Sequence, residues 1–319
     1  ADANRASSSS RVRSGSPGHG PGSAQPHRGA AWAARSAKRA WWTSTSQAIR
    51  WRTTSTGPHA PSGAGRSEAG TAAGTAAADN LAGVGCGTDR IDERVTVERL
   101  YDGDTVKLRD GRKIRFIGIN TPEMGRHGTS SQPLANTARD MLQTLLEKSN
   151  HTISLRYDAE RHDRYARDLA HVYLSDGSSV AAHLLERGLA TILPVPPNVW
   201  NLPCYQTTEH RARMARRGIW ALPEYQPIDA AQLRRADTGV RIVTGKVTAS
   251  HRRKGDIWLT LNDTLILHIG QRDRKYFPDT FPAEISGRSI IARGRVYFAE
   301  GTLRMQIRHP ATLQIQGMQ

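Results

Sequence analysis

The residues best suited to chemistry lie in the stretch from Tyr101 to Glu123, YDGDTVKLRDGRKIRFIGINTPE. One short segment holds two aspartates, Asp102 and Asp104. The next segment holds an arginine and three residues with oxygen atoms that could bind a cation or a proton: Arg115, Asn120, Thr121 and Glu123. Carboxylate and carbonyl oxygens bind hard cations, and a carboxylate can accept a proton from water. A guanidinium stabilises negative charge on a phosphate. These are the groups needed to break a phosphodiester, although carboxylates beside a turn can also simply solvate it.

A hairpin is predicted to bring the two segments together. Asp110-Gly111 is a two-residue turn signal, because both residue types tolerate a positive φ. The flanking residues alternate between apolar and polar, as half-buried strands do, with the apolar positions at Val106, Leu108, Ile114 and Phe116.

A second polar segment, DRYARDLAHVY from Asp163 to Tyr173, is predicted to be a loop that runs into a strand. Together with the Asp-Gly-Asp-Thr turn and the strand ending in Asn-Thr-Pro-Glu, it makes three ordered motifs. In order, spacing and flanking helices, the chain from about Val95 to Trp220 resembles the staphylococcal nuclease (thermonuclease) family. The resemblance implies a five-stranded OB-fold barrel with three helices, and calcium-dependent hydrolysis of DNA or RNA.

The resemblance also implies a calcium site. Asp104 is expected to be a direct ligand of the calcium ion. Asp102 is expected to support the residues around the ion without binding it directly. Asn120 occupies the second ligand position, and Thr121 would offer its backbone carbonyl. The family has an aspartate where this chain has Asn120, so one negative charge is lost and calcium affinity should fall.

Catalysis is expected to use three further residues. Glu123 corresponds to the general base that deprotonates the attacking water, while Arg115 and Arg167 correspond to the guanidiniums that bind the phosphate. Tyr165 corresponds to the tyrosine that borders the nucleotide. Two departures concern this region: Ala166 replaces a glycine, which is tolerable if its φ stays negative, and residues 193–196 lack a tyrosine pair of the family.

Composition divides the chain into four parts. Residues 1–85 are rich in Ala, Gly, Ser, Thr, Pro and Arg without apolar periodicity, so we expect a disordered basic segment. Residues 86–222 form the nuclease-like domain, with helices expected over 134–146, 180–190 and 205–217. Residues 223–237 are expected to be a linker. Residues 238–319 are predicted to form a second, OB-like β-barrel, which makes the whole chain a mainly β protein with helices (α+β).

The second barrel carries basic residues on one face of a predicted strand. Leu303, Met305 and Ile307 alternate with Arg304, Gln306 and Arg308. This basic face is either ordinary surface or a groove for single-stranded nucleic acid, and we favour the groove. Arg304 and Arg308 are therefore predicted to bind substrate.

The charge of the chain favours a polyanionic partner. It has 45 Lys and Arg against 29 Asp and Glu, a formal net charge of +16 and a pI near 10.6. No run of 18 or more apolar residues predicts a membrane span. No protein partner can be inferred, and a monomer is expected. No clear signal peptide is seen, yet a calcium requirement suits a secreted or periplasmic protein.

Cys86 and Cys204 flank the nuclease-like region and are too few for a tetrahedral zinc site. They are either two buried thiols or a disulfide.

Two functions are compatible with the sequence. One is a calcium-dependent nuclease, and the alternative is a non-catalytic nucleic-acid-binding protein on the same fold. Because degenerate copies usually lose the arginines or the base, the presence of Arg115, Glu123 and Arg167 favours catalysis.

Overall fold

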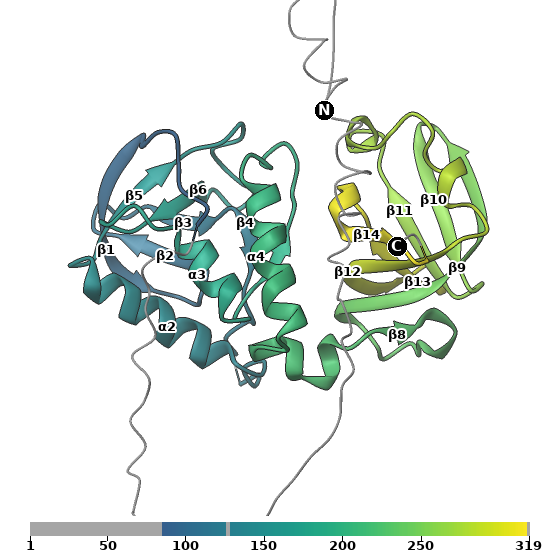
Figure 1. Cartoon of the computed structure of the whole chain (residues 1–319), viewed down its shortest axis with the longest axis horizontal. Helices are drawn as coiled ribbons and strands as arrows, with labels where there is room; N and C mark the ends of the chain where they lie inside the picture. Colours follow the sequence, from purple (N-terminus) through teal and green to yellow (C-terminus); the bar gives the residue numbers. More distant parts are fainter. Residues whose placement is uncertain (1–84, 126–127, 318–319) are drawn as a thin grey trace, which may run out of the picture. The chain divides into compact units, whose positions relative to one another are not determined.

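The computed structural model describes residues 85–125 and 128–317. Nearly all of the basic segment expected over residues 1–85 therefore lies outside the described residues. The described chain contains two β-barrels, whose strands and helices are labelled in Figure 1.

Five strands close the first barrel in the order β1-β2-β3-β6-β5. The predicted turn joins β2 to β3, with Gly111 at a φ of 92° and Val106 paired with Ile114. Both apolar side chains are fully buried, as the alternation predicted. The strands are β1 Glu93–Leu100, β2 Thr105–Leu108, β3 Lys113–Phe116, β5 Thr152–Arg156 and β6 Asp168–Tyr173. The predicted five-stranded barrel is confirmed.

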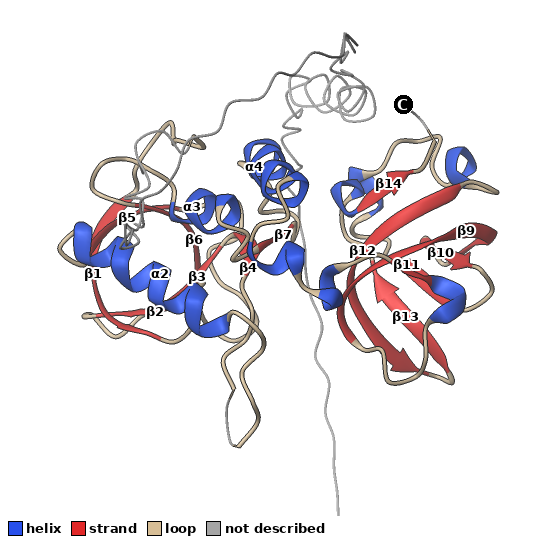
Figure 2. Ribbon diagram, turned by 60° about the horizontal axis from the view of Figure 1, so that its bottom comes forward, coloured by secondary structure: helices blue, strands red, loops and turns tan. Residues whose placement is uncertain are grey.

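Three α-helices accompany this barrel, as predicted: α2 Ala135–Lys148, α3 Val180–Glu186 and α4 Leu202–Met214. Along α2, Ala138, Leu142 and Leu145 recur at helical spacing and are buried. Helix α3 contacts both α2 and α4, and Figure 2 shows the helices beside the barrel strands. None of the described helices is long and apolar enough to cross a membrane.

A separate two-stranded sheet extends from the barrel. It pairs β4 (Gly118–Asn120) with β7 (Thr191–Leu193) in antiparallel register, so that Asn120 lies opposite Thr191. The buried Glu209 on α4 accepts a hydrogen bond of 2.8 Å from the backbone N–H of Ile192 in β7. Helix α4 thereby holds the strand that supports Asn120.

Cys86 and Cys204 form a disulfide, which decides between the two possibilities left open by the sequence. The bond joins the segment before β1 to the first turn of α4 across 118 residues of sequence. In the chain-entropy view, a cross-link that closes so long a loop stabilises the fold mainly by restricting the unfolded chain.

The second barrel repeats the strand order of the first. Strands β9, β10, β11, β13 and β12 follow one another, and a β12–β9 pairing closes the ring. In both barrels the third strand runs parallel to the fifth, as β3 does to β6 and β11 to β13. The bounds are β9 Gly239–Arg253, β10 Asp256–Leu261, β11 Leu265–Ile269, β12 Ser289–Ala299, β13 Thr302–Gln306 and β14 Leu313–Ile315. A second OB-like module is thus present.

The segment expected to be a linker has structure of its own. Within it, β8 (Ile228–Asp229) adds to the second sheet by pairing in parallel with β9. The segment also contains two short 3-10 helices, at 223–225 and 230–232. Further 3-10 helices lie outside it, at 218–221, 274–276, 283–285 and 310–312. Residues 223–237 therefore belong in part to the second barrel.

Side chains of the two barrels also meet. Arg293 on β12 forms an ion pair with the buried Glu209 of α4. Ile219 and Trp220, which end the nuclease-like region, share an apolar cluster with Ile242 of β9. Removing the second barrel would leave the Glu209 carboxylate buried without its charge partner, and such changes are strongly destabilising.

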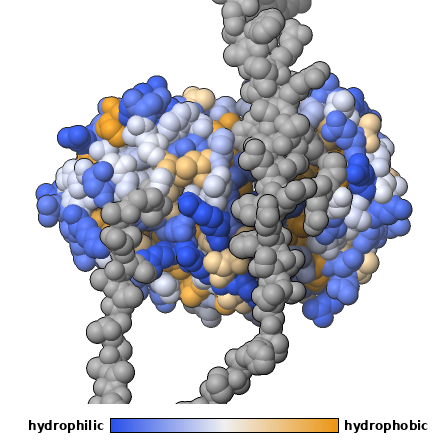
Figure 3. All heavy atoms as spheres, in the orientation of Figure 1, coloured by the Kyte–Doolittle hydropathy of each residue, from blue (hydrophilic) through white to orange (hydrophobic). Residues whose placement is uncertain are grey.

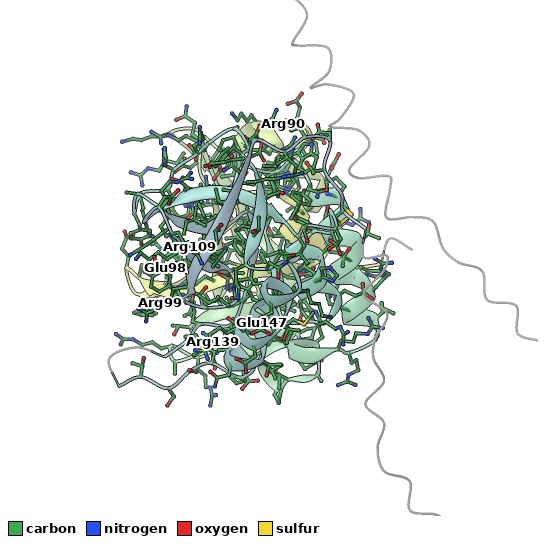
Figure 4. All side chains as sticks on the ribbon, turned by 90° about the vertical axis from the view of Figure 1, so that its left-hand side faces the viewer. Arg90, Glu98, Arg99, Arg109, Arg139 and Glu147 are labelled. Carbon is green, nitrogen blue, oxygen red and sulfur yellow. A yellow bond between two sulfur atoms is a disulfide. The ribbon has the colours of Figure 1, made fainter. Side chains whose placement is uncertain are left out.

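The surface is mixed in character. The visible face in Figure 3 is mainly hydrophilic, with scattered apolar patches. The side view in Figure 4 shows Arg99, Arg109 and Arg139 together with Glu98 and Glu147, so this side of the first barrel carries both signs of charge. Acidic side chains thus stand among the arginines labelled there.

One buried histidine gives the second barrel a predictable acid sensitivity. His309 Nδ1 accepts a hydrogen bond of 3.1 Å from the backbone N–H of Ala311, and burial lowers the pKa of His309 to about 4. The unfolded chain binds a proton near pH 6.5 and the folded one does not, so stability falls as pH drops through this window. We expect a loss of about 3 kcal/mol between pH 7 and pH 4 from this group.

His309→Asn isolates this effect, because an amide oxygen can accept the same bond without titrating. Urea unfolding of both proteins should be measured at pH 7 and at pH 4. The free energy of unfolding should decrease less between these two pH values in the variant than in the parent. An equal loss in the two proteins would contradict the assignment to His309.

Candidate functional site

The turn between β1 and β2 holds two buried carboxylates. Asp102 and Asp104 are only 5% and 4% exposed, and the backbone N–H of Asp104 donates to Asp102 Oδ1 at 3.1 Å. Burial, followed by the negative charge of Asp104, raises the pKa of Asp102 to about 6. Two carboxylates this close in a buried turn favour a positive partner.

Asp104 contacts two other segments of the chain, the one after β4 and strand β3. Its Oδ2 accepts hydrogen bonds from the backbone N–H and the hydroxyl of Thr121, at 2.8 and 3.1 Å. The same oxygen lies 3.2 Å from a terminal nitrogen of Arg115 on β3. The predicted convergence of the aspartate turn with the segment after β3 is therefore present.

Asn120 completes this cluster from the end of β4. Its Oδ1 accepts a hydrogen bond of 3.2 Å from Arg115, and its Nδ2 donates to the Thr121 carbonyl at 3.1 Å. Arg115 also donates to the Phe116 carbonyl at 2.6 Å. Asp102, Asp104, Arg115, Asn120 and Thr121 thus form one hydrogen-bonded unit, the acidic cluster.

The donor set of the acidic cluster fits a hard cation. It offers two carboxylates, the Asn120 amide oxygen and the Thr121 carbonyl, and calcium accepts all three kinds of oxygen. Among residues 85–125 and 128–317, no three His, Cys, Asp or Glu side chains gather as a potential metal site. A cation here would depend on amide and backbone oxygens beside the two aspartates.

Glu123 lies on the loop after the acidic cluster and is exposed. Its backbone is held from both sides by Gln132: Glu123 N–H donates to Gln132 Oε1 at 2.9 Å, and Gln132 N–H donates to the Glu123 carbonyl at 3.0 Å. Its carboxylate makes no contact with the acidic cluster among the described residues. The structure therefore anchors the main chain of Glu123 and leaves its carboxylate open to solvent.

Arg167 is placed by Asp163, in the loop before β6. Asp163 accepts hydrogen bonds from the backbone N–H groups of Tyr165 and Arg167, and from Arg167 Nε at 2.8 Å. These bonds, with the guanidinium of Arg167, lower the pKa of Asp163 against the opposing effect of its burial. Asp163 is thus an ionised anchor that the motif contained but whose role the sequence did not reveal.

Tyr165 stands out from the same loop. Its side chain is 64% exposed, and the guanidinium carbons of Arg164 and Arg167 lie 4.8 and 5.5 Å from its ring centre. Ala166 has a φ of 57°, contrary to the expectation of a negative φ. The loop keeps a left-handed conformation that glycine adopts more easily, at a cost of about 1 kcal/mol for alanine.

The two arginines expected in the second barrel have separate surroundings. Arg304 on β13 pairs with Glu300 at 2.6 Å. Arg308 is held by Asp273 at 3.0 Å and also donates to the Pro196 carbonyl. Neither contacts the acidic cluster, and the structure does not bring these two arginines together.

Comparison with known proteins agrees with this geometry. A family model described as staphylococcal nuclease homologue matches residues 113–222. The thermonuclease of Staphylococcus intermedius is 33% identical over 136 residues, which cover 42% of this chain and 79% of that protein. The thermonuclease of Staphylococcus hyicus is 32% identical over 128 residues, covering 39% and 74%. An uncharacterized endonuclease of Escherichia coli is 30% identical over 129 residues, covering 39% and 75%.

The first described part of the chain is thus an OB-type barrel that carries the acidic cluster at the ends of its strands. It belongs to the staphylococcal nuclease family. The family match covers part of the first barrel and the segment up to residue 222, and it ends before the strands of the second barrel begin.

Proposed function

We propose that this protein is a calcium-dependent nuclease that hydrolyses phosphodiester bonds of DNA or RNA as an endonuclease. The observation that carries the proposal is the acidic cluster, in which one carboxylate oxygen of Asp104 binds both Thr121 and Arg115. Relatives named as thermonucleases and an endonuclease support the same reaction class.

Asp104, Asn120 and the Thr121 carbonyl would hold the calcium ion, with Asp102 orienting Asp104. When bound, calcium supplies Lewis-acid stabilisation of the charge that builds on the phosphate. Arg115 binds Asp104 and Asn120, so its guanidinium lies beside two of the residues that would hold the cation.

Arg115 and Arg167 would both bind the phosphate. Asp163 engages Nε and one terminal nitrogen of Arg167, leaving the other terminal nitrogen for a phosphate oxygen. Planar guanidiniums bind phosphate through paired hydrogen bonds and stabilise its extra charge in the transition state. Tyr165, which both flanking arginines approach, would face the nucleotide.

Glu123 would take the proton of the attacking water. Its exposed carboxylate is free to reach a water at the phosphate, while Gln132 fixes the main chain from which it extends. A carboxylate base needs no covalent intermediate, so a single in-line displacement suffices.

The direct test is digestion of plasmid DNA and of RNA by the purified protein with calcium and with EDTA. We expect cleavage only with calcium, and nicking within circular DNA shows endonuclease action. Binding without cleavage in both conditions would favour the non-catalytic alternative.

We further propose that the protein acts in a secreted or periplasmic setting. The disulfide between Cys86 and Cys204 needs an oxidising compartment to form and persist. Calcium at about the millimolar level outside cells also suits a site with an amide ligand in place of a carboxylate.

Asn120→Asp is expected to lower the calcium concentration needed for half-maximal activity by about 10-fold, because a charged ligand replaces a neutral one. The change keeps the acceptor for Arg115. Activity should be titrated against calcium beside Asn150→Asp, which adds the same charge at an exposed site. A shift of equal size in both variants would mean that general electrostatics, not ligation, is responsible.

A further inference from the structure

The second barrel presents an aromatic row on its outer surface. Its first three strands in chain order are β9, β10 and β11. Trp258 on β10 pairs directly with His251 on β9 and with His268 on β11, so the three side chains share one face of the sheet. None of the three is buried.

The rings in this row are parallel. Trp258 and His268 stack with centroids 4.1 Å apart and an interplanar angle of 21°. Trp258 and His251 lie 6.3 Å apart at 6°. Asp256 holds His268 Nε2 at 2.9 Å and so fixes the ring at the end of the row. The row is pre-organised, which reduces the entropy lost when another flat ring stacks on it.

Cationic groups border the aromatic row. The guanidinium of Arg304 on β13 lies 5.6 Å from the Trp258 ring, and Tyr297 on β12 lies opposite Arg304 in the sheet. Arg253 and Lys254 are exposed at the end of the hairpin between β9 and β10. Asp256 and Glu300 contact residues of this face, and each is engaged there: Asp256 by His268 and Glu300 by Arg304. Residues 238–319 contain thirteen Lys and Arg against six Asp and Glu.

We infer that this face, formed by His251, Trp258, His268 and Arg304, binds single-stranded nucleic acid. The inference deepens the proposed function, on which it rests for the class of ligand. Oligonucleotides bind OB-type barrels across the second and third strands and the first hairpin loop, and these are the elements that carry Trp258, His268, Arg253 and Lys254 here. Bases stack on exposed rings while cations follow the phosphates.

The same geometry selects against a duplex. Bases within a double helix already stack on one another and offer no free face to His251 or Trp258. A duplex could therefore use only the cations, whereas a single strand uses rings and cations together. Arg304 belongs to this face because it lies over the Trp258 ring, whereas Arg308 is bound to Asp273 and to the Pro196 carbonyl.

Point variants in the full-length protein test the inference better than truncation, since Arg293 of this barrel pairs with the buried Glu209. Binding of a fluorescent twelve-nucleotide oligothymidylate is measured by anisotropy. The buffer contains EDTA, so that binding is followed without the cleavage reaction. We expect Trp258→Ala to weaken binding by about 10-fold, as the loss of one stacked base predicts. Trp258→Phe should recover most of this loss.

Arg304→Ala should weaken the same binding and reduce its salt dependence by about one counterion. Arg139→Ala removes an equal charge from an exposed position on α2, outside the second barrel, and should bind like the parent. Thermal melting establishes that every variant is folded.

A duplex of the same length separates stacking from charge. Trp258→Ala should leave duplex binding unchanged. An equal loss on the single strand and the duplex, or parental single-strand binding by both Trp258→Ala and Arg304→Ala, overturns the inference. Because no cleavage is measured, failure of the proposed nuclease activity would not alter these outcomes.

Discussion

Replacing Glu123 by glutamine is expected to reduce cleavage by about 10²-fold or more, because the variant keeps the shape of the side chain but cannot accept a proton from water. The contacts that position residue 123 involve its backbone and Gln132, so they remain in the variant. Folding and oligonucleotide binding should therefore stay near the parental level. The loss should appear in kcat under saturating calcium and substrate.

The matched control is Glu147→Gln, which removes a carboxylate from an exposed position on α2 of the same domain (Figure 4). Cleavage by this control should be close to that of the parent. If Glu123→Gln retains parental kcat, another group must take the proton. A loss confined to KM would instead assign Glu123 to substrate binding.

The local features of the site could be predicted from the sequence because neighbouring residues determine them. Asp110-Gly111 determines the hairpin, and the apolar alternation on either side determines which strand faces are buried. The hairpin then brings Asp104 toward the segment that begins after β3. The contact of Asp104 with Thr121 and Arg115 follows from this chain path together with the resemblance to the family.

Features that depend on distant segments could not be predicted in the same way. The Gln132 side chain that fixes Glu123 carries no motif of its own. The pairing of Glu209 with Arg293 joins residues 84 positions apart in sequence, and no local pattern marks either residue. The positive φ of Ala166 is set by the hydrogen bonds of Asp163 rather than by the preference of alanine.

The second barrel shows a different limit of sequence reasoning. Alternation along β13 correctly separates apolar from basic residues, but it cannot show what each basic side chain meets across the sheet. Arg308 is held by Asp273, whereas Arg304 lies beside Trp258. The aromatic row is visible only once β9, β10 and β11 are in register, because its three members lie on three different strands and only the pairing places them side by side.

Arg115→Lys is the second variant with a large expected effect, because lysine keeps the charge of Arg115 but not its geometry. The guanidinium contacts the Phe116 carbonyl, the Asn120 amide oxygen and the Asp104 carboxylate through its two terminal nitrogens. A single ammonium cannot hold these acceptors and also present a planar pair of donors to a phosphate. We expect kcat to fall by about 10²-fold, the scale seen when one preorganised donor to a developing charge is removed.

Arg109→Lys provides the comparison, since Arg109 is an exposed arginine on the same hairpin. Its variant should keep parental kcat and KM. Steady-state kinetics at several calcium concentrations then distinguish two roles of Arg115. A loss in kcat that persists at saturating calcium places the guanidinium on the phosphate in the transition state. Full recovery at high calcium would mean that Arg115 only arranges Asp104 and Asn120 for the cation, and the proposed contact with the phosphate would be wrong.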